Sequence, residues 1–90
     1  MATLFENSKG YKVLVLSAHE SSWWKRAEKC DTCGSRIVTT GYYVTAFNQY
    51  LCPECYDEWC LAAPKKVPAH DEIEETFLER IRRHRRILID

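Results

Sequence analysis

The chain has 90 residues, of which 46% are hydrophobic and 29% charged, with 13 basic and 13 acidic side chains. This length fits one small domain, whose core is marginal unless a staple such as a metal ion supports it. The zero net charge excludes a general electrostatic attraction to nucleic acid or membranes. The composition argues against disorder, and the longest apolar run, residues 13–16, is far too short to span a bilayer.

The N-terminal residues predict a location inside the cell, either cytoplasmic or nuclear. Residues 1–7 show no basic region followed by an apolar stretch, which is the pattern of a secretory signal. Cysteines in a reducing compartment stay as thiols, which favours a metal site over disulfides.

The first thirty residues predict one strand and one helical turn. Residues 12–17 contain Val-Leu-Val-Leu, which is typical of a strand buried on both faces. Residues 17–29 predict a helical turn and carry Trp23 and Trp24. Aromatic side chains are numerous for so small a core, so one or two of them are expected at a partner interface, where tryptophan and arginine are enriched.

Four cysteines form two pairs, Cys30-x2-Cys33 and Cys52-x2-Cys55, with 18 residues between the pairs. This spacing predicts one structural zinc ion, because each two-residue spacer lets a tight turn aim two sulfurs at one tetrahedral ion. Iron is the alternative metal for four thiolates. Four ligands close the site and leave no position for water, and no other catalytic motif is recognisable, so no enzyme activity is expected. Cys60 is expected to be a small core residue, with a substitute ligand role as the alternative.

The residues between and after the pairs predict a hairpin and a helix. Residues 36–39 and 42–47 are rich in β-branched and aromatic side chains around Thr40-Gly41. Pro53 suits the first position of a helix and the acids that follow suit its positive end, so a short helix is expected to end before Pro64. A treble clef consists of a tight turn with the first two ligands (the zinc knuckle), a β-hairpin and a helix that carries the last two ligands. A zinc ribbon would place the second pair on another turn.

The C-terminal part predicts an amphipathic helix. Pro-Lys-Lys-Val-Pro at residues 64–68 reads as a stiff linker, and a helix is expected over residues 71–89. Its acids lead and its arginines trail, in agreement with the helix dipole. The fold class is therefore α+β, with a treble-clef domain and N-terminal strand at residues 1–63, a linker at 64–69 and the helix at 70–90. The expected apolar stripe of this helix comprises Ile73, Phe77, Ile81, His84 and Leu88.

Two motifs resemble known zinc fingers. Cys-Asp-Thr-Cys-Gly-Ser-Arg-Ile and Tyr-Leu-Cys-Pro-Glu-Cys resemble GATA-type fingers and the DksA/TraR transcription regulators over residues 30–60. The resemblance implies the four paired cysteines as ligands. GATA-type fingers carry basic residues after the last pair, where this chain has Tyr56-Asp57-Glu58-Trp59, and DksA/TraR proteins need a long coiled coil. HNH nucleases, which also use treble clefs, need a histidine near the hairpin, and residues 34–51 contain none.

Two functions follow from these patterns. The first is a zinc-stabilised regulator or adaptor that binds a protein partner, whose C-terminal helix packs on its own domain or pairs with a second copy in a homodimer. The alternative is a nucleic-acid-binding regulator. That alternative depends on five arginines over two helical turns, which could contact phosphates but also suit a solvated face: Arg80, Arg82, Arg83, Arg85 and Arg86.

Overall fold

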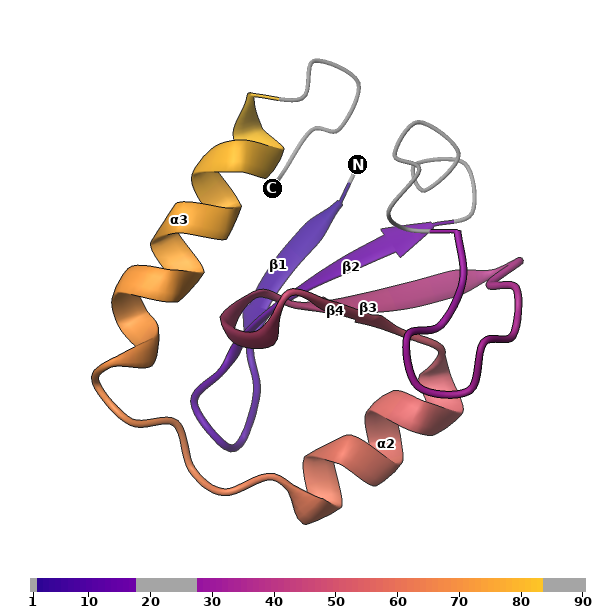
Figure 1. The fold of residues 1–90 in the computed structure, drawn as a ribbon, viewed down its shortest axis with the longest axis horizontal. Helices are drawn as coiled ribbons and strands as arrows, with labels where there is room; N and C mark the ends of the chain where they lie inside the picture. The colour runs from indigo at the N-terminus through magenta and orange to yellow at the C-terminus, as the bar shows by residue number, and fades with distance from the viewer. Residues whose placement is uncertain (1, 18–27, 84–90) are drawn as a thin grey trace.

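The computed structural model describes residues 2–17 and 28–83 (Figure 1). They form a small α+β domain with a four-stranded antiparallel sheet and, in the described ranges, two α-helices. The elements in chain order are β1 (Thr3–Glu6), β2 (Lys12–Ser17), β3 (Thr40–Val44), the 3-10 turn η2 (Thr45–Phe47), β4 (Gln49–Leu51), α2 (Pro53–Ala62) and α3 (His70–Arg82).

The sheet order follows the chain order, β1-β2-β3-β4. The predicted strand at residues 12–17 is confirmed as β2, with Val13, Leu14 and Leu16 buried. Strand β1 was not predicted. It exists because residues 7–11 form a turn in which the Asn7 side-chain oxygen accepts backbone N–H bonds from Lys9 and Tyr11, at 3.0 and 2.9 Å. Asparagine favours such turns, so this residue was the available signal for the first hairpin.

The predicted hairpin around Thr40-Gly41 is wrong. Both residues lie inside β3, and the hairpin joins β3 to β4 through η2 and Asn48. Asn48 has a φ of 52°, a left-handed conformation that asparagine tolerates better than most residues. Gly41 makes room for the ring of Tyr50, which occupies the space where a side chain at residue 41 would be. A glycine in a strand can therefore mark a close approach rather than a turn.

Adding one methyl group at Gly41 is expected to destabilise the domain. The new Cβ would overlap the ring of Tyr50, which is fully buried. Gly41→Ala should therefore lower the free energy of unfolding by about 1–3 kcal/mol in chemical denaturation. In a Tyr50→Leu background most of this cost should disappear. An equal cost in both backgrounds would contradict the overlap.

The predicted stripe of the C-terminal helix is displaced by one residue at its start. Ile73 is 40% exposed, whereas Glu74, Leu78 and Ile81 are buried and Phe77 is partly buried. The face of α3 that contains residue 74 lies against the sheet, because the Glu74 carboxylate accepts the Lys12 backbone N–H at 2.7 Å. The remaining members of the expected stripe, His84 and Leu88, lie outside the described residues.

The segment between α2 and α3 is attached along the β1–β2 turn. The Lys66 N–H donates to the Lys9 carbonyl at 2.8 Å, and the Lys9 ammonium donates to the Ala63 carbonyl at 2.9 Å. The Tyr11 hydroxyl donates to the Pro64 carbonyl at 2.9 Å. These bonds hold the segment that connects α2 to α3. The two helices lie on different sides of the strands in Figure 1.

An aromatic cluster fixes α2 against the rest of the domain. The buried ring of Tyr11 lies 5.0 Å from that of Trp59 on α2 and 5.6 Å from that of Phe47 in η2. On the sheet, Tyr42 stacks on Tyr56 at a centroid distance of 4.4 Å. Since the second cysteine pair stands at the beginning of α2, these contacts also fix the position of that pair.

Candidate metal centre

The first cysteine pair lies on a tight turn. The Gly34 N–H donates to the Cys30 carbonyl at 2.9 Å, and the Cys30 N–H donates to the Ser35 carbonyl at 2.9 Å. Gly34 has a φ of 76°, which a residue with a side chain rarely adopts. Lys29 and Arg36 form a single antiparallel bridge that closes the base of the turn. This arrangement aims the side chains of Cys30 and Cys33 to one side.

The second pair lies at the N-terminus of α2, as the sequence predicts. Cys52 is the N-cap residue, in extended conformation, and its carbonyl accepts the Tyr56 N–H at 2.9 Å. Pro53 occupies the first helical turn, where the lack of an N–H costs nothing. Cys55 follows one turn after Cys52, so the helix presents both thiols on the same side.

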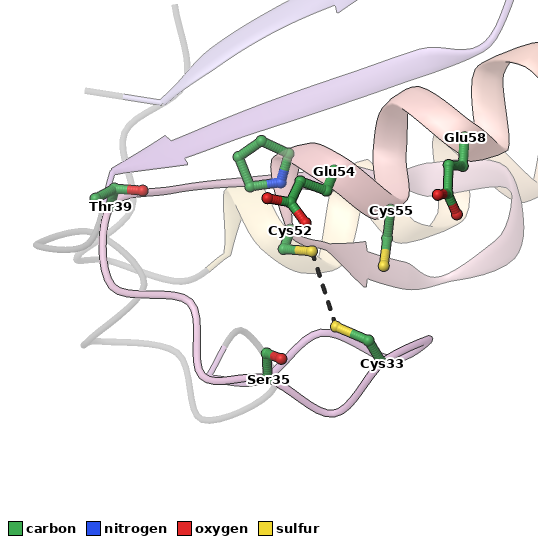
Figure 2. A pocket seen from close by; sticks show the side chains of 8 residues that line it. Cys33, Ser35, Thr39, Cys52, Glu54, Cys55 and Glu58 are labelled. Carbon is green, nitrogen blue, oxygen red and sulfur yellow. Dashed lines mark hydrogen bonds between the residues drawn. The ribbon is translucent and has the colours of Figure 1, made fainter.

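The four sulfurs of Cys30, Cys33, Cys52 and Cys55 converge. All lie within 4.8 Å of one another. Figure 2 shows three of these cysteines, Cys33, Cys52 and Cys55, and the sulfurs of Cys33 and Cys52 are 3.9 Å apart. A tetrahedral zinc ion with Zn–S bonds of about 2.3 Å needs sulfurs roughly 3.8 Å apart. The donor set and its spacing therefore fit a four-thiolate metal ion, and zinc is the metal that such a set favours.

The thiols sit at unequal depths. Cys30 is 3% exposed and belongs to the hydrophobic core, Cys52 and Cys55 are half-buried, and Cys33 is exposed. An open pocket is lined by Cys33, Cys52 and Cys55 but not by Cys30. The same pocket is bordered by Ser35, Thr39, Pro53, Glu54 and Glu58 (Figure 2). The site therefore anchors to the core on one side and faces solvent on the other.

The pKa values of the clustered thiols are shifted in opposite directions. The Ser35 hydroxyl and backbone N–H lower the pKa of the Cys33 thiol to about 6. The pKa of Cys55 is raised, chiefly by its hydrogen bond with Cys52 and then by burial. Four thiolates this close repel one another, and a divalent cation would remove that repulsion.

Asp31, which was not predicted as a site residue, connects the knuckle (residues 28–37) to the sheet. Its N–H donates to the Tyr50 carbonyl at 2.9 Å, and its carboxylate accepts the Tyr50 N–H at 2.8 Å. These two bonds continue the pairing of β4 beyond its outer edge. The only sequence signal was an acid directly after the first ligand.

Removing the Asp31 carboxylate should loosen the knuckle. Asp31→Ala leaves the Tyr50 N–H without this acceptor, so we expect the free energy of unfolding of the metal-loaded protein to fall by about 1–2 kcal/mol. Asp31→Asn keeps an acceptor oxygen and should lose less than half of that. Equal losses in urea denaturation of the two variants would argue against the hydrogen bond.

The other candidate residues lie apart from the cluster. Cys60 is not among the clustered thiols, and its sulfur is 3.9 Å from the Asn7 amide, which also donates to the Tyr56 hydroxyl at 3.3 Å. On α3, the Arg80 guanidinium lies 5.2 Å from the Phe77 ring centre, and Arg82 is 4.0 Å from Glu75. Arg83 is exposed at the end of α3. The remaining candidates, Trp23, Trp24, Arg85 and Arg86, lie outside the described residues.

Comparison of the chain with protein-family models, curated proteins and solved structures returned no match. In residues 2–17 and 28–83, neither helix has the length and apolar character needed to cross a membrane.

Proposed function

We propose that the four clustered cysteines hold one structural zinc ion. The observation that carries this proposal is the convergence of all four sulfurs within 4.8 Å from two separate chain segments. Four thiolates complete a tetrahedral shell, so the ion would link the knuckle to α2 rather than activate water. The closed shell supports a structural rather than a catalytic role for the ion.

The zinc-binding part is proposed to be a treble clef. The knuckle at residues 28–37, the β3–β4 hairpin and the N-terminus of α2 follow one another in that order, and the outer segments supply the ligands. In this arrangement β1, β2 and α3 are additions that enlarge the core around the finger.

Metal analysis tests the site directly. Protein purified without chelator is expected to contain one zinc per chain, and cobalt substitution should give the absorption spectrum of a tetrahedral thiolate site. Iron in place of zinc would be recognised by the colour of its oxidised thiolate complex. A chain that folds fully with no bound metal, and gives no tetrahedral cobalt spectrum, would refute the proposal.

The function that this centre supports best is a regulator or adaptor acting through a protein partner. The open side of the centre carries Glu54 and Glu58, and together with a doubly negative zinc–tetrathiolate they would repel phosphate. On α3, the guanidinium groups of Arg80 and Arg82 lie beside Phe77 and Glu75, and the acids Asp71 and Glu72 occupy the first turn. The chain as a whole has no net charge.

Nucleic-acid binding by the arginine-rich end is the competing function, and it predicts a clear result. If it were correct, the zinc-loaded protein would bind duplex DNA or single-stranded RNA with an affinity that falls steeply with salt. Replacing Arg82, Arg83, Arg85 and Arg86 by glutamine would then abolish binding. We expect no salt-dependent binding by the parent protein in a fluorescence-anisotropy titration, and we expect the quadruple variant to keep the parent's protein partner.

A further inference from the structure

The four thiols of the centre differ in their access to solvent. Cys33 lies on the exposed turn and lines the open pocket, whereas Cys30 is 3% exposed and packed in the core. A small neutral oxidant can therefore reach the Cys33 sulfur without any opening of the fold, but it cannot reach the Cys30 sulfur. Exposed thiolates, including those bound to a metal, are the ones that oxidants select.

We propose that Cys33 is a site of oxidation by hydroperoxides, with Cys52 as the thiol that completes the disulfide. This inference rests on the proposed zinc site and adds a means of regulating it. Oxidation would remove two of the four ligands and release the ion.

The geometry selects Cys52 as the partner. Its sulfur is 3.9 Å from that of Cys33, and the two face each other across the open side of the site (Figure 2). A disulfide of about 2.05 Å needs the sulfurs to approach by roughly 2 Å. The knuckle can supply such a movement more easily than α2, because residues 31–36 of its turn are exposed and include Gly34.

The chemistry balances with the hydroperoxide as the sole oxidant. The Cys33 thiolate attacks one peroxide oxygen, the O–O bond breaks, and a sulfenic acid and hydroxide form. The Cys52 thiolate then attacks the Cys33 sulfur and expels a second hydroxide. Two thiolates lose two electrons, and hydrogen peroxide gains them and leaves as two waters after protonation. Cys30 and Cys55 remain as a two-thiolate set that holds zinc far more weakly.

The experiment treats the zinc-loaded full chain with hydrogen peroxide at limiting dose. Released zinc is measured with a chromogenic chelator, the free thiols are alkylated, and the protein is digested with trypsin without reduction. Cleavage after Lys29, Arg36 and Lys65 places Cys30 and Cys33 in one peptide and Cys52, Cys55 and Cys60 in another. A Cys33–Cys52 bond therefore joins peptide 30–36 to peptide 37–65, and fragmentation identifies the two cysteines.

We expect about one zinc released per joined peptide pair, and roughly tenfold more oxidation at Cys33 than at Cys30. A Cys60→Ser variant should release zinc at the parent's rate, since Cys60 is not among the clustered thiols. Peptides that close internally, or oxidation of Cys60 with zinc retained, would overturn the inference. Absence of bound zinc before treatment would instead refute the proposed zinc site, so the two failures are distinguishable.

Discussion

Cys30→Ser is expected to abolish stable zinc binding and to unfold most of the domain. Structural zinc in a site of this type contributes on the order of 10 kcal/mol, which is comparable to the whole stability of a small domain. The effect should not remain local, because Cys30, Ile37 and Tyr56 belong to the same buried cluster as the sheet residues Leu14 and Tyr43. Loss of the knuckle would therefore expose the core that the strands share.

Circular dichroism and zinc content measure this result. The variant should lose most of its ordered signal at a temperature where the parent is folded, and excess chelator should have the same effect on the parent. Cys60→Ser is the matched control, because it changes the same atom at a cysteine that is not among the clustered thiols. A Cys30→Ser protein that melts with the parent would show that the metal is not needed for folding.

Glu74→Leu is expected to lower the free energy of unfolding by about 3 kcal/mol. Glu74 is fully buried, and its carboxylate accepts hydrogen bonds from the Lys12 backbone N–H at 2.7 Å and from the Lys66 ammonium at 3.0 Å. The substitution leaves the Lys12 N–H without this acceptor and removes one of the two carboxylates, Glu74 and Asp71, that hold Lys66 within the linker. The cost should appear as partial detachment of α3.

Urea denaturation and hydrogen exchange in α3 check this prediction. Glu79→Leu is the control, since it makes the same change on an exposed position of α3 and should shift stability by no more than about 0.5 kcal/mol. Equal effects at the two positions would mean that the buried carboxylate does not hold the helix.

The same cluster gives a dependence on pH. The carboxylates of Asp71, at 2.7 Å, and Glu74 raise the pKa of Lys66 to about 12 from its ordinary value of 10.5. A raised pKa favours the protonated form in the folded state. The stabilisation is therefore complete below pH 10.5 and is lost as the pH rises towards 12. A Lys66→Met variant should lack this component of the alkaline loss.

Local sequence patterns were sufficient to predict an element where one segment determines its own conformation. Val-Leu-Val-Leu forms β2, and proline after Cys52 marks the beginning of α2. The spacing of the two cysteine pairs identified the four thiols that converge, because a metal site restricts ligand type and separation regardless of the rest of the fold. These features depend on covalent geometry and on residue chemistry, both of which are visible in a sequence.

The tertiary structure decided what depends on neighbours distant in the chain. Gly41 looks like a turn residue until the Tyr50 ring is seen to lie against it, and Ile73 looks buried until Glu74 is seen to accept a hydrogen bond from β2. The hydrogen bond between Asp31 and β4 and the exposure of Cys33 also depend on residues distant in the chain. Each follows from packing between segments brought together only by folding, and no periodicity within a single segment encodes such contacts.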